Sequence, residues 1–166
     1  MFLEGRSAGC CSATYVLKVN GRPIGKYEGR WFSECLDLAL TGRRQLEFRK
    51  VGWLASEFEL IDVHADEVVA SCRRSGIFTT SWDVTLSIGA AQLVSIGWLN
   101  TAYELWMGQE SVARVDRLGM CERGWIVDAS GELAEEDMLL IGLVYHTIIQ
   151  RQQQQQQAGG AAAAGT

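Results

Sequence analysis

The sequence contains a single proline, Pro23, only two histidines, His64 and His146, and no Cys-x-x-Cys pair. With one proline, almost the whole chain is free to form continuous strand ladders or helix. The five cysteines are odd in number and scattered, so we expect no disulfide framework and a reducing compartment, the cytoplasm. The two histidines lie in different contexts and supply no Ser-His or Cys-His constellation, so we expect a protein without catalytic machinery or cofactor.

Basic charge and long apolar runs are also scarce. The chain has 15 Lys and Arg against 20 Asp and Glu, a net charge of −5, which argues against nucleic acid as a partner. Residues 1–13 lack the basic start and apolar stretch of a secretory signal. The densest apolar segment, Met138–Ile149, would span about 18 Å as a helix, whereas a bilayer core needs about 30 Å. We therefore expect no transmembrane segment.

Three regions are expected along the 166 residues. Residues 1–13, rich in Gly, Ser and Cys, predict a disordered leader. Within it Gly5–Gly9 fits the G-x-S-x-G pattern of hydrolases, but the strand-to-helix context that this pattern needs is not predicted. Residues 14–151 form the folded domain, and residues 152–166 predict a low-complexity Gln/Ala/Gly tail, disordered or frayed from the preceding helix.

Alternation of apolar and polar residues dominates the folded region and predicts half-buried antiparallel strands. An internal repeat reads aromatic–x–aliphatic, turn, aliphatic–small–polar–apolar. Its first three copies begin 43 and 45 residues apart, at Tyr15, Phe58 and Tyr103, and an incomplete fourth begins at Trp125. Each gap between the first three copies holds a further strand pair, which gives about eleven strands. Small residues recur at one position of the repeat, and we expect the wall to make room there for a helix; they are Gly25, Ala70 and Ala113.

One helix is expected after the strands, over residues 135–151. Its first turn carries Glu135, Glu136 and Asp137, which the positive end of the helix dipole favours. The following apolar residues cover every side of the helix, so it must be buried all round. A barrel of eleven or twelve strands has room for a helix along its axis. The predicted fold is mainly β: a closed antiparallel barrel of about 12 strands wrapped around one buried C-terminal helix.

Hairpins of this kind followed by one apolar C-terminal helix resemble the tubby C-terminal-like superfamily, which includes tubby-like domains, LURP-one-related proteins and phospholipid scramblases. The resemblance covers Thr14 to Arg151 and is carried by Phe58–Arg74, Tyr103–Arg117 and Met138–Ile149. It implies a barrel of about twelve strands around a central helix. It also implies anionic lipid ligands, since tubby-like domains bind phosphoinositide headgroups and scramblases act at membranes. No segment matches a phosphoinositide-binding motif residue by residue, so the resemblance assigns no site.

Paired cations provide the candidate site residues. They occur at Arg43-Arg44, Arg49-Lys50 and Arg73-Arg74. Adjacent strand residues point to opposite faces, so each pair places one side chain outward and one towards the lumen or a barrel end. We select the outward members, Arg43, Arg49 and Arg73, as tentative contacts for an anionic headgroup if they converge. The alternative is ordinary solvated charge on the barrel exterior.

The histidines give two further hypotheses. Asp62, His64, Asp66 and Glu67 crowd one predicted turn, and whether they bind a cation stays open because only one nitrogen ligand is present. His146 lies within the apolar helix, where we expect a buried residue hydrogen-bonded to a strand.

The sequence thus predicts a non-catalytic binding or scaffold module that recognises anionic phospholipid headgroups or a protein partner at a membrane surface. The alternative is a lipocalin-like barrel that carries a small apolar ligand, which requires the helix to lie outside the barrel. The natural ligand and the oligomeric state are left open.

Overall fold

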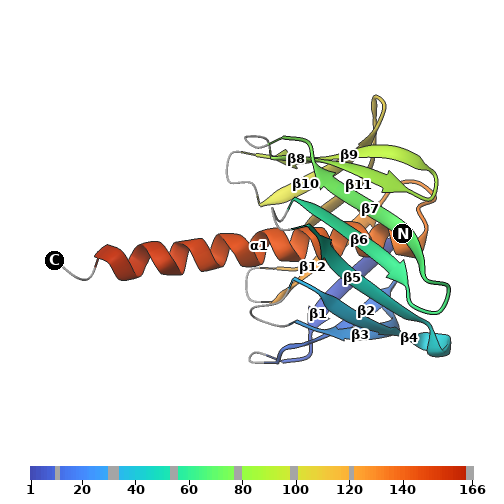
Figure 1. Cartoon of the computed structure of the whole chain (residues 1–166), viewed down its shortest axis with the longest axis horizontal. Coiled ribbons are helices and arrows are strands. Elements are labelled where there is room, and N and C mark those ends of the chain that lie inside the picture. The colour runs from blue at the N-terminus through green and yellow to red at the C-terminus, as the bar shows by residue number, and fades with distance from the viewer. Residues whose placement is uncertain are drawn as a thin grey trace.

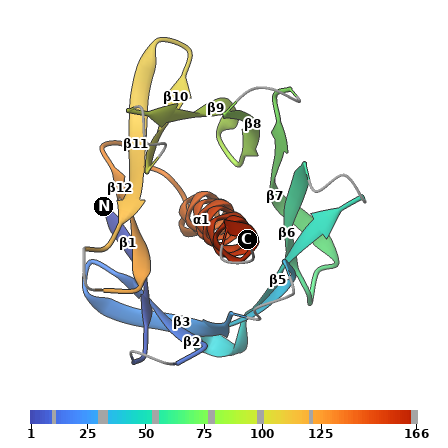
Figure 2. The same cartoon turned by 90° about the vertical axis from the view of Figure 1, so that its left-hand side faces the viewer.

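Twelve antiparallel strands close into a barrel around the first half of one C-terminal helix in the computed structural model of the chain (Figures 1 and 2). The structure describes residues 1–9, 12–29, 34–52, 56–76, 80–97, 101–119 and 122–163, with side chains to residue 157. Each strand pairs with its neighbours in sequence, and β1 pairs with β12 to close the barrel. The predicted fold class is confirmed.

The strands are five to eight residues long and follow one another around the barrel in sequence order. They are β1 (Phe2–Ser7), β2 (Thr14–Val19), β3 (Arg22–Glu28), β4 (Leu36–Leu40), β5 (Gln45–Val51), β6 (Glu57–Asp62), β7 (Glu67–Arg74), β8 (Ser81–Leu86), β9 (Gly89–Ile96), β10 (Ala102–Met107), β11 (Glu110–Arg117) and β12 (Gly124–Ala129). A short 3-10 helix, η1 (Thr41–Arg43), joins β4 to β5, and the helix α1 spans Glu135–Ala163.

The prediction of a disordered leader over residues 1–13 is wrong, because β1 is the strand that completes the barrel. It pairs with β2 on one side and β12 on the other, and Leu3 is fully buried. The inward positions of β1 include Gly5, where a Cβ atom would lie 2.4 Å from the ring of Trp125. The apolar–polar alternation of β1 is not recognisable in the sequence, because one of its inward positions is a glycine that leaves space for the indole.

The internal repeat corresponds to three equivalent hairpins, β2–β3, β6–β7 and β10–β11. In each, the register shifts directly after the repeated leucine, between residues 17 and 18, 60 and 61, and 105 and 106. Opposite these leucines lie the small residues Gly25, Ala70 and Ala113. Such bulges bend a strand and increase its twist, and here they recur at every fourth strand of a closed wall.

The expectation that these small residues make room for the helix fails for Gly25. A Cβ atom there would lie 2.5 Å from the carbonyl oxygen of Ala39 and 2.7 Å from Leu40 Cδ2. Gly25 therefore permits the close approach of β4, the neighbour of β3. Ala70 and Ala113 are buried on β7 and β11, two strands that α1 does contact.

The helix α1 passes along the barrel axis and continues beyond it (Figure 1). Its residues from Met138 to Ile148 are buried, whereas the glutamines from Gln153 to Gln157 are exposed. The tail predicted from residue 152 thus continues as helix to Ala163. Within the described ranges no helix combines the length and apolar character needed to cross a bilayer.

The two ends of the barrel differ, and we name them the base and the mouth. The base is the end at which α1 begins, where the turns at 20–21, 41–44, 63–66, 87–88 and 108–109 lie. The mouth is the opposite end, from which α1 leaves, with the strand ends Ser7, Glu28, Val51, Arg74, Ile96 and Arg117. Side chains on the inner face of the mouth can therefore meet the outer half of α1.

Candidate functional site

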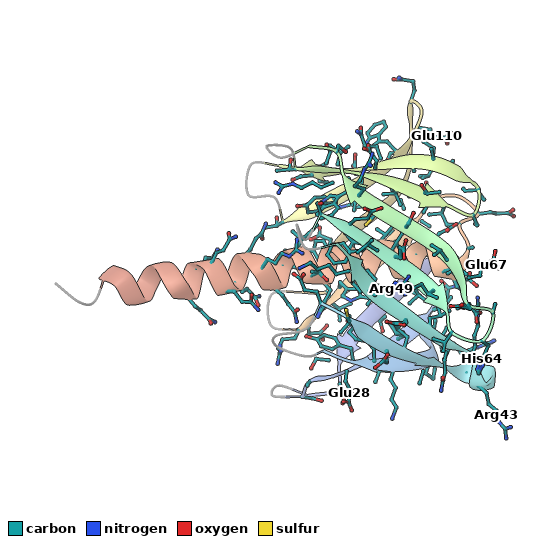
Figure 3. The ribbon with its side chains drawn as sticks, in the orientation of Figure 1. Glu28, Arg43, Arg49, His64, Glu67 and Glu110 are labelled. Atoms are coloured by element: carbon teal, nitrogen blue, oxygen red, sulfur yellow. The ribbon has the colours of Figure 1, made fainter. Side chains whose placement is uncertain are left out.

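The three arginines predicted to contact an anion do not come together. Arg43 lies in η1 at the base, whereas Arg49 lies on the outer face of β5 (Figure 3). The Arg49 guanidinium pairs with Glu59 on β6, with Nη2 3.0 Å from Oε2. Arg73 lies on β7, separated from β5 by the whole width of β6.

Carboxylates surround the two arginines on the outer wall. Arg73 stands opposite Glu57 on β6 and Asp83 on β8 in the strand register. Together with Glu59, these acids outnumber the arginines, so this part of the exterior is not a basic patch. The outer wall of β5–β8 is better described as a mixed, solvated surface.

The second members of two of these pairs, Lys50 and Arg74, lie at the inner side of the mouth. Lys50 follows Leu46 and Phe48 on the inner face of β5 and reaches the mouth, where Nζ lies 3.5 Å from Glu34 Oε2. Glu34 also accepts a hydrogen bond from Nε of Arg151 on α1. Burial alone would raise the pKa of Glu34, but Arg151 and Lys50 outweigh it and hold the pKa below its ordinary value.

Arg74, the inward member of the third pair, lines a cavity of about 150 Å³ between the mouth and α1. Trp82 and Tyr103 from the barrel and Ile148 and Arg151 from α1 line it with Arg74. The Arg151 guanidinium lies over the ring of Phe58, 5.3 Å from its centroid. This cavity places two guanidinium groups beside aromatic side chains.

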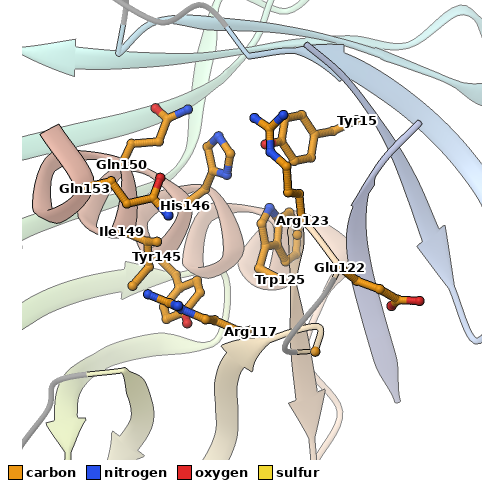
Figure 4. Close-up of a pocket in the computed structure, with 12 residues that line it drawn as sticks. Tyr15, Arg117, Glu122, Arg123, Trp125, Tyr145, His146, Ile149, Gln150 and Gln153 are labelled. Carbon is orange, nitrogen blue, oxygen red and sulfur yellow. The ribbon is translucent and has the colours of Figure 1, made fainter. Parts of the chain in front are cut away.

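A second cavity of about 210 Å³, which we name the seam cavity, lies between α1 and the mouth ends of β2, β11 and β12 (Figure 4). Arg117 and Arg123 supply its positive charge, and Tyr15, Tyr145 and His146 supply aromatic walls. Tyr145 Oη donates a hydrogen bond to the carbonyl oxygen of Thr101 at 2.7 Å. Burial raises the pKa of the Tyr145 phenol, so it stays a neutral hydroxyl.

His146 is the most unusual residue of the seam cavity. Its side chain is only 8% exposed, as expected, and it meets Tyr15 and Tyr27 edge to face, with ring centroids 4.8 and 5.8 Å away. The expected hydrogen bond to a strand is not found for Nε2, which is buried and has no partner among the described residues. Burial, with a smaller effect from the positive charge of Arg123, lowers the pKa of His146 to about 4. The imidazole is therefore neutral at physiological pH.

One turn was proposed as a possible cation site; it contains Asp62, His64, Asp66 and Glu67. In the structure the Asp62 carboxylate accepts hydrogen bonds from the protein itself. Asp62 Oδ1 accepts the backbone N–H groups of His64 and Ala65, at 3.0 and 3.2 Å, and Oδ2 accepts Nε of Arg44 at 3.0 Å. No group of three metal-ligating side chains occurs in the part of the chain that the structure describes. Arg44 also binds Glu136, so this cluster fastens the start of α1 to the base.

The G-x-S-x-G pattern at the start of the chain lies in a strand and the turn after it. Ser7 ends β1, and the next described element is the strand β2. Its Oγ donates to the carbonyl oxygen of Gly9 at 2.7 Å. The strand-to-helix turn that exposes a nucleophilic serine is not formed there.

The sequence does contain a signal for the basic residues of the mouth. It was missed because the arginines selected as candidates were the outward-facing members of the pairs. Lys50, Arg74 and Arg117 each continue the inward series of a strand, two residues after a buried Phe48, Cys72 or Val115. A cation at the end of such a series must lie at the rim of the lumen. No family model, curated protein or solved structure matches the chain.

Proposed function

We propose that the chain is a member of the tubby C-terminal-like superfamily and a non-catalytic binding module of the cytoplasm that recognises anionic phospholipid headgroups through its mouth. The twelve-stranded closure around one helix, which the resemblance implies, supports the family assignment. The positive charge of the mouth is the observation that supports an anionic ligand. Because α1 fills the lumen, the empty cup of a lipocalin-like carrier is not formed by the described residues.

The inner side of the mouth carries a surplus of positive charge. Its basic side chains among the described residues are Lys50, Arg74, Arg117, Arg123 and Arg151. In the described part of the inner rim two carboxylates accompany them: Glu34, which pairs with Lys50 and Arg151, and Glu122, which pairs with Arg6 at 3.1 Å. Basic side chains near an anionic leaflet each contribute about 1 kcal/mol of attraction. The chain as a whole is acidic, but the inner rim of its mouth is basic.

The sequence between the strand ends of the mouth favours a membrane over a soluble anion. These residues lie outside the described ranges, and it is their composition alone that favours a membrane. Apolar and aromatic residues are frequent in the segments that join these strands; they are Trp31, Phe32, Trp53, Leu54, Ile77, Phe78, Trp98, Leu99 and Met120. Tryptophan and other apolar side chains next to basic ones are typical of surfaces that bind the membrane interface.

Co-sedimentation with vesicles tests the proposal. We expect the chain to bind vesicles with anionic phospholipids, to bind neutral phosphatidylcholine vesicles at least tenfold more weakly, and to dissociate as salt is raised. Charge reversal at the mouth, Arg117→Glu with Arg123→Glu, should weaken binding to anionic vesicles at least tenfold.

The outer wall supplies the matched control, Arg49→Glu with Arg73→Glu, which changes the net charge by the same amount. We expect this variant to keep most of the binding. Equal binding to neutral and anionic vesicles would overturn the proposal, and so would an equal loss in the two double variants. If only the outer-wall variant lost binding, the headgroup site would lie on the exterior.

A further inference from the structure

We propose that the seam cavity is a binding site for a small organic acid, whose carboxylate or phosphate pairs with Arg117 or Arg123 while its ring or short chain packs against Tyr15 and Tyr145. The inference goes beyond the proposed function, because such a ligand is bound from solution and needs no membrane.

The size of the cavity limits the ligand. At about 210 Å³ it lies below the range of roughly 300–1,000 Å³ that is typical of sites for drug-sized molecules. A single substituted ring or a short acyl chain is the size of molecule that such a space accepts. The cavity lies between α1 and the barrel and is lined by residues of both (Figure 4).

The charge of the cavity selects an anion. Arg117 ends β11 and Arg123 directly precedes β12, and both line the cavity, Arg117 beside Tyr145 and Arg123 beside Tyr15 (Figure 4). The neighbouring carboxylate of Glu122 is directed away from the imidazole and pairs with Arg6 (Figure 4). A planar guanidinium binds a carboxylate or phosphate through two parallel N–H donors.

The imidazole of His146 supplies the second observation that points to a ligand. A buried polar atom without a partner costs free energy, and native structures satisfy nearly all such atoms. Nε2 of His146 is such an atom, on a side chain more than nine-tenths buried that lines the cavity. Since the ring is neutral, Nε2 either donates a hydrogen bond to a ligand oxygen or accepts one from a ligand hydroxyl.

The remaining walls suit an apolar body. Tyr15 and Tyr145 present rings, and Ile149 of α1 adds an aliphatic side chain. Tyr15 is held in place by stacking on Tyr27, with centroids 5.0 Å apart and planes inclined by 6°. An aromatic or branched aliphatic group gains contact with these walls, whereas a bare ion does not.

Nuclear magnetic resonance of the full chain can test the site directly, because the two histidines report on opposite ends of the barrel. We would titrate the protein, without lipid, with benzoate, phenyl phosphate, benzyl alcohol and inorganic phosphate. We expect benzoate or phenyl phosphate to shift the imidazole resonances of His146 in a saturable manner and to leave those of His64 unchanged. Benzyl alcohol and inorganic phosphate should bind at least tenfold more weakly, since the alcohol lacks the anionic group and the phosphate lacks the apolar group.

Two variants complete the test. Arg117→Gln with Arg123→Gln should weaken binding of the acid tenfold or more, the loss typical of removing a charge-assisted hydrogen bond. Arg114→Gln on the outer face of β11 is the control and should bind as the original chain does. The inference is overturned if neither acid shifts His146, if the alcohol binds as tightly as the acids, or if the double variant binds unchanged. Each of these results leaves the vesicle experiment free to succeed, so the two proposals fail independently.

Discussion

Trp125 shows how single residues fix the relation between wall and helix. Its indole is fully buried, and Nε1 donates a hydrogen bond to Tyr27 Oη at 3.0 Å. A glycine lies on either side of it: Gly5 in β1 and Gly142 in α1, where a Cβ atom would lie 2.4 and 2.1 Å from ring atoms of Trp125. The helix thus makes room for the wall at this point, rather than the wall for the helix.

Gly142→Ala should destabilise the protein by about 2 kcal/mol or more, because the added methyl group overlaps a ring that a hydrogen bond holds in place. The same exchange at an open helix position would gain up to about 1 kcal/mol from helix propensity. Gly131→Ala, where nothing lies within 4 Å, is the control and should change stability by less than about 0.5 kcal/mol. Urea denaturation measures both variants. Equal stability of the two would show that the Trp125 ring shifts to accommodate the added methyl group.

His146 makes the fold sensitive to mild acid. Its pKa falls from the ordinary 6.5 to about 4 in the fold, where Tyr15, Tyr27 and the charge of Arg123 face it. Between these values the unfolded chain binds a proton that the folded chain does not. Stability is therefore complete above about pH 6.5 and is lost as the pH falls towards 4.

The expected loss between pH 7.5 and pH 5 is about 2 kcal/mol, from a shift worth 1.36 kcal/mol per pH unit. His146→Gln should remove most of this dependence, because the glutamine side chain does not titrate. His64→Gln, at the exposed turn of the base, should retain it. Denaturation curves at the two pH values measure the effect, and an unchanged pH dependence in His146→Gln would assign the loss to other groups.

At the scale of elements, α1 is fastened to the barrel at both ends of its buried half. At the base, Asp137 is completely buried and accepts the backbone N–H and the hydroxyl of Ser87, at 2.9 and 2.6 Å. At the mouth, Arg151 binds Glu34. The first contact uses a carboxylate in the first turn of α1, where the helix dipole also favours it.

Asp137→Ala should cost about 1–3 kcal/mol, because two hydrogen bonds to a charged group are lost together with the favourable helix-terminal charge. Glu135→Ala is the matched control: it removes a carboxylate from the same turn, but that side chain is exposed. We expect its cost to stay below about 0.5 kcal/mol in the same thermal and urea denaturation measurements. Equal losses would mean that the dipole, not the bond to Ser87, is the larger contribution.

At the scale of the whole molecule, the core is shared between the inner face of every strand and the buried half of α1. Buried leucine and aromatic side chains of the wall face Met138, Leu139, Leu140 and the apolar residues that follow. Neither part has another partner for this surface in the described structure. Folding of wall and helix should therefore be one cooperative event.

Truncation tests this expectation. A chain that ends at Gln155 keeps every buried residue of α1 and should unfold within about 0.5 kcal/mol of the full chain. A chain that ends at Ala134 loses the side chains that fill the lumen and should not form a cooperative fold. Circular dichroism with urea measures both, and a stable barrel in the second chain would contradict the shared core.

The sequence by itself determined the strands, the repeat and the burial of the helix. Alternation in segments such as Trp82–Leu86 is a local property, since inward and outward positions are two residues apart in any strand. The apolar residues on all sides of α1 required a surrounding wall for the same local reason. These features could be predicted without knowing which strands are neighbours.

Only the tertiary structure decided that β1 belongs to the wall and which cations share a site. The role of Gly5 is apparent only once it is seen to leave space for Trp125. The two residues are far apart in the chain but paired in register. Likewise Arg117, Arg123 and His146 line one cavity because the mouth ends of β11 and β12 lie where α1 leaves the barrel. The partners of β1, the strand register and the direction of the helix are properties of long-range pairing, so no local pattern encodes them.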